Sequence, residues 1–457
     1  MNAHDASRRR FLQNASAGFM AAAASGGFGT SARGAQKTGT LAVLGGSPVR
    51  TKPFSAWPPV TPEIEQSVLS ALRSRSWGRT LQGAMQGAGQ VVELEKRLAG
   101  LVGAKWCLAT GSCTQALHTA LHAVGVAAGD EVLVNPCTFI ATVQSILMCN
   151  ALPVFVDVDL DTFQMDAGML ESLITADTRA IEPVHIAGLP CDMDPIIAVA
   201  RKHDLRVVED AAQALLAEYK GKKCGTFGDL GCVSFQSSKQ LACGEGGAIF
   251  GNDEELIEKC YVFHNMGLSG KPGGISVGTK YRMHELEAAV LLPQLATIAD
   301  QTRVRNVNAR YLAGRLAQIP GIAPQKLHEG TTQGAYYLCG FRYQKEHFND
   351  VPKDQFLRAL RAEGISGTTT MYFDQLNKQP FIEQTLNSRT FQKIYSKQRL
   401  DRYRQQNHCP RNDRLSAEGV WFGQQLLLGE QSDMDDIADA IAKIHDQKDQ
   451  LARSSRS

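Results

Sequence analysis

Short apolar runs alternate with helical patterns between residues 131 and 250, and this alternation limits the possible folds more than any other feature of the sequence. Continuous apolar strands separated by helices are typical of a mostly parallel sheet with helices on both faces. The fold class is therefore α/β. The runs predict six buried strands, at residues 131–134, 153–158, 180–185, 206–209, 231–235 and 247–250, and helical patterns fill intervals such as 138–150 and 194–203.

A second, smaller domain is expected after a long amphipathic stretch at residues 283–319. The patterns that follow predict a strand at 336–343, a helix at 353–363, a strand at 365–370 and a terminal helix at 433–446. This order predicts a C-terminal α+β domain. We divide the chain into an N-terminal segment (1–36), a large domain (37–300) and a small domain (301–457). The polar stretch 387–407 contains no glycine or proline and predicts a solvated helix or a mobile insertion.

The composition excludes several classes of protein. The 457 residues carry a net charge of +2 and are 43% hydrophobic, as in an ordinary globular chain. This balance gives no electrostatic footprint for a nucleic acid, so we expect no nucleic-acid partner. Eleven cysteines are an odd number, and we interpret most of them as small core residues. No cysteine or histidine cluster has the spacing of a zinc site, so no metal is expected.

The N-terminus is typical of an export signal. Ser7-Arg8-Arg9-Arg10-Phe11-Leu12-Gln13 precedes an uncharged stretch at residues 15–29, and this order resembles the twin-arginine signal. The apolar stretch is shorter than the roughly 20 residues that a membrane-spanning helix needs, so we expect no span in the mature chain. The signal predicts export of the folded protein through the twin-arginine pathway to the periplasm. A disordered basic tail is the alternative.

Two charged residues mark the expected site. Asp210 follows the strand at 206–209, at the end where ligands bind in open α/β sheets. Lys239 follows the strand at 231–235, and Gly244-Glu245-Gly246-Gly247 supplies a tight turn into the next strand. A lysine in a partly desolvated site can bond an aldehyde, and a carboxylate can pair with a cationic ring nitrogen. These are the two essentials of pyridoxal phosphate chemistry.

The ordered set of motifs resembles the DegT/StrS-type aminotransferases, which act on keto-sugars and keto-cyclitols. The motifs are Glu209-Asp210-x-Ala-Gln213, Ser234-Phe235-x-x-x-Lys239 and Gly244-Glu245-Gly246-Gly247, and the resemblance spans residues 41 to 448. It implies pyridoxal-phosphate-dependent transferase fold type I, as in aspartate aminotransferase, with a large αβα domain and a smaller C-terminal α+β domain. The stretches 44–50 and 434–438 most resemble glutamine:scyllo-inosose aminotransferases within the family.

The resemblance assigns roles to individual residues. It implies that Lys239 bonds the aldehyde of pyridoxal phosphate and then moves a proton, and that Asp210 pairs with the ring nitrogen. Gln213 would lie near the phenolic oxygen of the ring, Phe139 would stack on the ring face, and Ser234 would help to hold the phosphate. A core residue is the alternative for Gln213 and for Phe139.

Two positions depart from the family pattern. Cys113-Thr114 stands where most members have Gly-Thr in the first phosphate-binding turn. Thr114 still begins a helix, whose first N–H groups can hold an anion, but the side chain of Cys113 leaves the geometry of the turn open. Lys280 stands where the family has an asparagine that reaches the phosphate of the neighbouring subunit. A lysine there can contact phosphate or can be a solvated residue. The contact would imply a homodimer with shared active sites.

The sequence does not decide whether two histidines contact the substrate or have a structural role. His185 ends the strand at 180–185, near the expected substrate pocket, and is a candidate substrate contact. A structural role, with both ring nitrogens bonded within the protein, is the alternative. The same caution applies to His264, which precedes Asn265.

The leading hypothesis is an aminotransferase that moves an amino group from glutamate or glutamine to a keto-sugar or keto-cyclitol. One alternative is a pyridoxal-phosphate-dependent sugar dehydratase of the same fold. Such enzymes typically replace the lysine with histidine, and Lys239 argues against this. The other alternative is a non-catalytic exported protein that binds pyridoxal phosphate or a sugar, since the export signal and the altered phosphate turn are both unusual.

Overall fold

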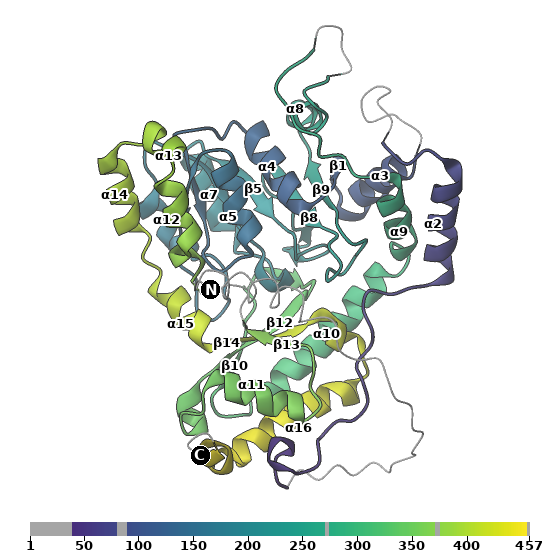
Figure 1. Ribbon diagram of the computed structural model, residues 1–457, viewed down its shortest axis with the longest axis vertical. Coiled ribbons are helices and arrows are strands. Elements are labelled where there is room, and N and C mark those ends of the chain that lie inside the picture. The colour runs from purple at the N-terminus through teal and green to yellow at the C-terminus, as the bar shows by residue number, and fades with distance from the viewer. Residues whose placement is uncertain (1–38, 80–88, 270–273, 371–374, 455–457) are drawn as a thin grey trace, which may run out of the picture.

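The structure is a computed structural model that describes residues 39–79, 89–269, 274–370 and 375–454. The export signal expected at residues 1–36 lies outside the described residues. Within the described ranges, no helix combines the length and the apolar character needed to cross a membrane. Figure 1 shows two domains, with the large one above the small one.

A seven-stranded sheet forms the centre of the large domain. Its order is β1-β9-β8-β5-β4-β2-β3, and β9 runs antiparallel to both β1 and β8 while the other pairs are parallel. The strands are β1 (Trp106–Thr110), β2 (Glu131–Val134), β3 (Leu152–Phe155), β4 (Thr178–Glu182), β5 (Arg206–Asp210), β8 (Leu230–Ser234) and β9 (Gly247–Gly251). All six expected strands are confirmed, and β1 was not predicted.

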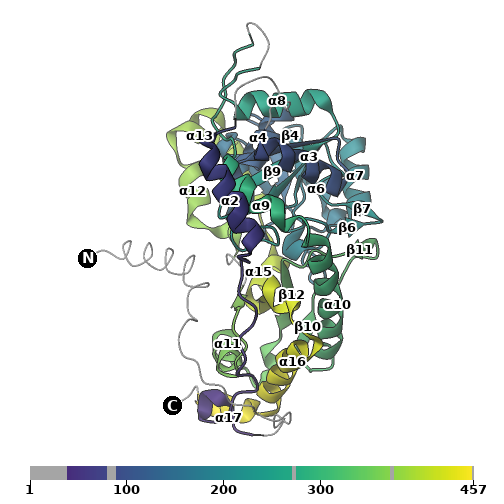
Figure 2. The same ribbon diagram turned by 90° about the vertical axis from the view of Figure 1, so that its right-hand side faces the viewer.

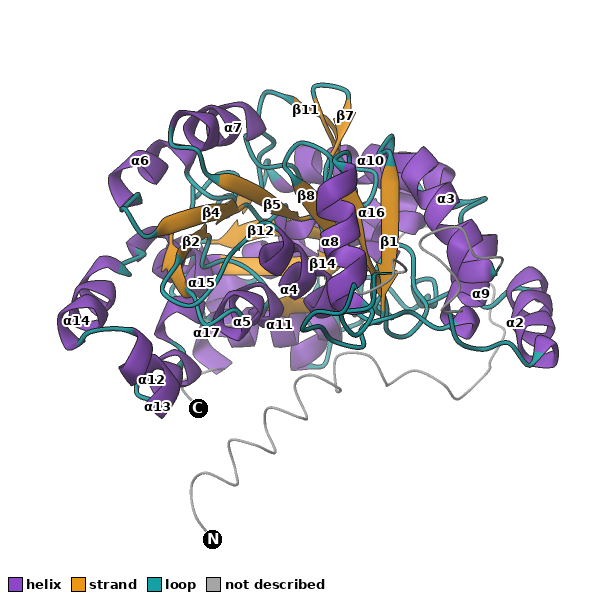
Figure 3. Ribbon diagram, turned by 90° about the horizontal axis from the view of Figure 1, so that it is seen from above, coloured by secondary structure: helices purple, strands orange, loops and turns teal. Residues whose placement is uncertain are grey.

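Helices cover both faces of this sheet (Figure 3). One face packs against α4 (Cys113–Ala123), α5 (Ile140–Met148) and α8 (Glu254–His264), whose apolar side chains share a core with alternate strand residues. The other face packs against α7 (Met193–Lys202) on one half and against α3 (Gln90–Val102) and α9 (Glu285–Gln294) on the other. The strands are apolar on both sides because both sides are covered. The layered α/β prediction and fold type I are therefore confirmed.

The small domain is a four-stranded antiparallel sheet with helices on one side. Its strand order is β10-β12-β14-β13, and α10, α11 and α16 pack around the same core. The elements are α10 (Ile298–Leu316), β10 (Ile322–Pro324), β12 (Leu338–Tyr343), α11 (Lys353–Ala362), β13 (Thr368–Thr370), β14 (Gly419–Gly423) and α16 (Gln431–Asp446). The long α10 begins at the large domain and descends into the small one (Figure 2).

The first described segment packs with the small domain, although it precedes the large domain in the sequence. Leu41 is buried in the small-domain core, and the backbone N–H groups of Ala42 and Val49 donate to the carboxylate of Glu363. Arg50 forms a buried ion pair with Asp433. The division of the chain near residue 300 stays a prediction, and the strand and helix patterns of a sequence contain no information on these long-range contacts.

The polar stretch at 387–407 is helical, as the first of its two predicted alternatives expects, but one face of it packs against the large domain instead of being solvated. It forms α13 (Arg389–Ile394) and α14 (Lys397–Gln406), between α12 (Pro380–Leu386) and α15 (Pro410–Glu418), and lies beside the large domain (Figure 1). Tyr403 is buried and donates to the carbonyl of Pro153, and Asn407 accepts from the N–H of Phe155. These helices therefore cover the edge strand β3, an edge that would otherwise be open to pairing.

Candidate active site

Lys239 lies in the turn between β8 and β9, at the junction of the two domains. Its Nζ is 3.9 Å from the centre of the ring of Tyr337, a residue that directly precedes β12 of the small domain. The indole Nε1 of Trp57 donates to the backbone carbonyl of Lys239 (3.0 Å), and the N–H of Lys239 donates to Gln236. The lysine is half-buried and is held at its backbone and against an aromatic face. The sequence offered no signal for Trp57 or Tyr337.

Asp210 ends β5 and is almost fully buried, close enough to Lys239 for their charges to interact. Thr142 Oγ1 donates to Oδ2 (2.7 Å), and the N–H of Ala212 donates to Oδ1 (3.0 Å). Burial raises the pKa of Asp210, whereas these hydrogen bonds and the charge of Lys239 act in the opposite direction. A cationic ring nitrogen beside this carboxylate would offset its burial. The structure therefore brings Lys239 and Asp210 together as the sequence predicted.

The side chain of Glu209 points to the face of the sheet opposite to that of Asp210, and it holds the loop at residues 225–228 in place. It is fully buried and accepts hydrogen bonds from the backbone N–H groups of Gly225 (2.8 Å), Phe227 (2.6 Å) and Gly228 (2.8 Å). His185 Nε2 lies 2.9 Å from Glu209 Oε2. Four donors around one carboxylate offset the cost of burying its charge.

His185 has the structural role that the sequence left as an alternative, so its interpretation as a substrate contact is corrected. The side chain is fully buried, and the N–H of Cys191 donates to Nδ1 (3.0 Å). Nδ1 is therefore the acceptor, and the proton lies on Nε2, which donates to Glu209. His264 is also fully buried, with Nδ1 2.6 Å from the carbonyl of Tyr261. Burial and the charge of Arg79 lower the pKa of His264 to about 3.

Gln213 lies three residues after Asp210, and Phe139 lies at the start of α5, the helix that carries Thr142. The Oε1 of Gln213 accepts from the N–H of Ala187 (2.7 Å), so its Nε2 is the end oriented to donate to a ring oxygen. Phe139 is the N-cap residue of α5, one turn before Thr142, and 47% of its side chain is exposed. An aromatic ring at this place can cover a ligand bound at Asp210. The hydrogen bond from Thr142 to Asp210 was not predicted from the sequence.

The phosphate turn forms the N-terminus of α4. Ser112 is the N-cap, and its Oγ accepts from the N–H of Gln115 (3.2 Å). Cys113 and Thr114 are the first two helical residues, whose N–H groups have no acceptor within the helix. The side chain of Cys113 is buried in the core, while its effect on phosphate binding stays a prediction.

Gly247 allows β9 to approach this turn. A Cβ on Gly247 would lie 2.5 Å from the backbone nitrogen of Cys113, so only glycine fits. Ser234 pairs with Gly247 across β8 and β9 and therefore lies near the same helix end. Oriented N–H groups at a helix N-terminus bind anions. The geometry fits a phosphate group, while the contact from Ser234 stays a prediction.

Lys280 is exposed and lies on the segment that runs beside the phosphate turn. The backbone carbonyl of its neighbour Tyr281 accepts a hydrogen bond from the N–H of Gly111 (2.8 Å), and Lys280 forms an isolated antiparallel β-bridge with Asn265. In the part of the chain that the structure describes, no hydrogen bond or ion pair joins Lys280 to Lys239 or Asp210. Its role at a partner's phosphate stays a prediction.

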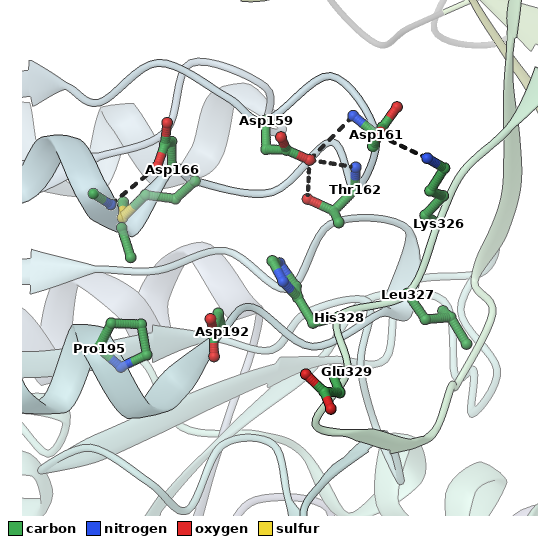
Figure 4. Close-up of a pocket in the computed structure, with 13 residues that line it drawn as sticks. Asp159, Asp161, Thr162, Asp166, Asp192, Pro195, Lys326, Leu327, His328 and Glu329 are labelled. Atoms are coloured by element: carbon green, nitrogen blue, oxygen red, sulfur yellow. Dashed lines mark hydrogen bonds and ion pairs between the residues drawn. The ribbon is translucent and has the colours of Figure 1, made fainter.

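A pocket of about 490 Å³ lies apart from these residues (Figure 4). It is lined by the loop after β3 and by residues 326–329, and none of the expected site residues lines it. Two of its carboxylates are bonded within the protein: Asp159 accepts from Thr162, and Asp161 pairs with Lys326. The pocket therefore lies mainly in the large domain, beside residues 326–329, and away from the site at Lys239.

Glu182, the last residue of β4, is a buried acid that the sequence analysis did not single out. It shares one face of its strand with Ala180 and Val184, which lie in the apolar core beneath α4 and α5. Among the described residues, neither of its oxygens has a hydrogen-bond partner. Burial and then the negative charge of Asp210 raise the pKa of Glu182 well above its usual range. Hydrogen-bond donors favour the charged form of Asp210, whereas Glu182 has none among the described residues, so we expect Glu182 to hold its proton to a higher pH than Asp210.

Comparisons with known proteins agree with this geometry. A model of the DegT/DnrJ/EryC1/StrS aminotransferase family matches residues 64–414. The chain is 34% identical over 417 residues to the L-glutamine:2-deoxy-scyllo-inosose aminotransferase of Streptomyces fradiae, covering 88% of this chain and 97% of the relative.

A second relative is the GDP-perosamine synthase of Caulobacter vibrioides, which is 40% identical over 277 residues and covers 60% of this chain and 74% of the relative. Among solved structures, a 3-amino-5-hydroxybenzoic acid synthase superposes with a TM-score of 0.75 at 28% identity, covering 86% of this chain and 98% of that one. The likeness therefore extends over both domains.

Replacing Glu182 with glutamine tests its protonation. The raised pKa means that the folded state holds the proton after the unfolded state has released it near pH 4.5. Wild-type stability then falls relative to Glu182→Gln as the pH rises, by up to about 1.4 kcal/mol for each pH unit until the folded acid ionises. The measurement is the free energy of unfolding in urea across pH.

The exposed Glu254→Gln variant is the control, and its difference from the wild type should stay constant with pH. A constant difference for Glu182→Gln as well would show that the carboxyl is ionised in the folded protein.

Proposed function

The chain belongs to the DegT/DnrJ/EryC1/StrS aminotransferase family, and we propose that it transfers an amino group from glutamate or glutamine to a keto-sugar or keto-cyclitol. It is a pyridoxal-phosphate-dependent transaminase. The observation that carries the proposal is the arrangement of Lys239 and Asp210 at one edge of the sheet. The relatives named as a glutamine:inosose aminotransferase and a GDP-perosamine synthase support a polyhydroxylated ketone as the acceptor.

The residues of the site fit pyridoxal phosphate. When bound, this group supplies an aldehyde that bonds amino groups and a ring that stores electrons. Lys239 would bind the aldehyde through Nζ, and after its displacement by the donor the same Nζ would move a proton at the substrate carbon. Asp210 would hold a proton on the ring nitrogen through its carboxylate. The N–H groups of Cys113 and Thr114 would hold the phosphate.

Other residues orient these groups. Gln213 Nε2 would donate to the ring oxygen, because Ala187 fixes the other end of the amide. Trp57 bonds the backbone carbonyl of Lys239, and the ring of Tyr337 lies beside its Nζ, so the two residues limit how the lysine can move. The dehydratase alternative is disfavoured because Lys239 occupies the position where that class has histidine. The non-catalytic alternative requires that amino donors leave the bound cofactor unchanged.

We also propose that the reaction takes place outside the cytoplasm. The proposal rests on the twin-arginine-like stretch Ser7-Arg8-Arg9-Arg10-Phe11-Leu12-Gln13, because that pathway exports folded proteins. The cysteines are compatible with an oxidising compartment. All eleven are free, and burial raises the pKa of thiols such as those of Cys113 and Cys232, which makes them unreactive.

The absorption spectrum tests the proposed reaction. The wild-type protein loaded with pyridoxal phosphate should show a visible band, which L-glutamine or L-glutamate converts to the spectrum of pyridoxamine phosphate. Lys239→Ala should lose the band and slow the conversion by at least roughly 100-fold, because the residue that bonds the aldehyde and moves the proton is gone. Lys259→Ala, an exposed lysine, should behave as the wild type.

Two outcomes would contradict the reaction. A band that survives in Lys239→Ala would remove the lysine from the site. A band that neither donor changes would favour the non-catalytic alternative.

We propose further that the active protein is a homodimer in which Lys280 reaches the phosphate of the partner subunit. The exposed position of Lys280, beside its own phosphate turn but without a contact to Asp210 or Lys239 among the described residues, supports a contact across an interface. A lysine binds phosphate as a point charge. A glutamate at this position would repel the phosphate.

Subunit mixing tests the shared site. Lys239→Ala and Lys280→Glu should each be nearly inactive as homodimers, but a hybrid of the two places both lesions in one site and leaves the other intact. Activity should therefore return after the subunits exchange. A mixture of Lys239→Ala with Asp210→Asn is the control, because each site of that hybrid keeps one lesion. No recovery in the first mixture, or equal recovery in both, would contradict a shared site.

A further inference from the structure

The segment Thr138-Phe139-Ile140-Ala141-Thr142 buries two threonines and exposes the aromatic ring between them. Thr138 and Thr142 are buried, whereas 47% of the side chain of Phe139 is exposed. Thr142 lies in the first turn of α5, and its N–H donates to the carbonyl of Phe139 (3.2 Å). One short segment therefore presents a ring at the surface of the site and places two hydroxyls in the interior.

The two hydroxyls form a chain, called here the hydroxyl chain, that ends on Asp210. Thr138 Oγ1 lies 2.7 Å from Thr142 Oγ1, and Thr142 Oγ1 lies 2.7 Å from Oδ2 of Asp210. An ionised carboxylate can only accept, so the single proton of the Thr142 hydroxyl points to Asp210. Thr138 is then the donor to Thr142. Both hydroxyls donate toward the carboxylate, and a hydroxyl that accepts a hydrogen bond is itself a stronger donor.

The loop that carries Thr138 is held in place by Asn135. This side chain is fully buried; its Nδ2 donates to the carbonyl of Cys137 (2.9 Å), and its Oδ1 accepts from the N–H of Val184 (3.3 Å). Val184 follows β4 and forms a parallel β-bridge with Asp210. The outer end of the hydroxyl chain and its acceptor are therefore fixed to the same edge of the sheet.

The charge of Asp210 depends on these donors. Burial raises the pKa of Asp210, and the hydroxyl of Thr142 is the largest influence in the opposite direction. Smaller influences in that direction come from Ala212, Lys239 and His185. The other titratable groups near Asp210 are buried acids and thiols whose pKa values burial raises, so they favour their neutral forms; these groups are Glu182, Cys113, Cys191 and Cys232. Hydrogen bonds therefore favour the ionised form of Asp210 more than the neighbouring charges do.

We propose that Thr138 and Thr142 are positioning residues that hold Asp210 ionised opposite the ring nitrogen of pyridoxal phosphate, and this inference rests on the proposed function. A carboxylate keeps a proton on the ring nitrogen only if it does not take that proton itself. A hydrogen bond to a charged oxygen is roughly twice as strong as one to a neutral oxygen, so the hydroxyl chain favours the ionised acid. The two threonines act through Asp210 and not on the cofactor directly.

Replacing Thr142 with valine keeps the shape of the side chain and removes the hydroxyl. The pKa of Asp210 in the folded state then rises further, so the variant holds a proton that the wild type has released and loses stability relative to the wild type as the pH rises. Its ratio of folded to unfolded protein should fall by an additional factor of roughly 10 between acidic and neutral pH. Thr138→Val should act in the same direction by about 2-fold. The measurement is urea unfolding of the full chain, freed of cofactor, across pH.

An Asp210→Asn background shows whether the effect passes through the carboxylate. In that background the cost of Thr142→Val should not change with pH. Thr142→Ser keeps the hydroxyl and should follow the wild type, and Thr142→Ala covers the case in which the valine variant does not fold. Thr302→Val is the matched control, because the buried hydroxyl of Thr302 donates to the neutral carbonyl of Ile298 (2.8 Å) and its loss should cost the same at every pH.

The pH profile of the loaded protein gives a second readout. Conversion of the visible band by L-glutamine should begin to fail on the acidic side at a pH about one unit higher in Thr142→Val than in the wild type and in Thr142→Ser, because Asp210 takes up a proton earlier.

A cost of Thr142→Val that is the same at every pH, or a pH-dependent cost that persists with Asp210→Asn, would overturn the role of the hydroxyl chain. A wild type that glutamine fails to convert would overturn the proposed reaction, and the unfolding measurements would still decide whether the hydroxyl chain holds Asp210 ionised.

Discussion

Two adjacent carboxylates at the end of β5 determine the arrangement of the site. Successive side chains of a strand point to opposite faces, so Glu209 and Asp210 enter different surroundings. Glu209 is held by three backbone N–H groups and by His185, which fixes the loops beneath the sheet edge. Asp210 has fewer donors and remains beside Lys239. Burial raises the pKa of Glu182 and so favours its neutral form, which leaves Asp210 as the acid expected to face a cationic ring with a negative charge.

The remaining parts of the site come from segments that the fold brings to this edge. The absence of a side chain on Gly247 lets the N-terminus of α4 pack against β9, and the N-terminus of α5 contributes Thr142 to Asp210. The small domain contributes Tyr337, and the N-terminal segment contributes Trp57. Lys239 therefore has contacts outside the large domain, which couples its position to the packing of the two domains.

The sequence predicted the frame of this site well. Buried strands are apolar throughout, so six of them were recognised, and the order of motifs placed Lys239 and Asp210 together. Long-range contacts have no local pattern, which is why the contacts of Trp57 and Tyr337 with Lys239 were not predicted. Glu182 escaped notice because it is one acid within an otherwise apolar run. His185 shows that a position at a strand end is not enough to identify a substrate contact, because the same position also suits a histidine that supports Glu209.

The central claim is that Asp210 keeps a bound ring nitrogen protonated while Glu182 stays neutral. The direct measurement is the nitrogen-15 chemical shift of pyridoxal phosphate labelled at the ring nitrogen and bound to the protein, recorded from acidic to alkaline pH. The account predicts the shift of a protonated pyridinium in the wild type and in Glu182→Gln, and that of a neutral pyridine at neutral pH in Asp210→Asn. A neutral ring nitrogen in the wild type at neutral pH would contradict it.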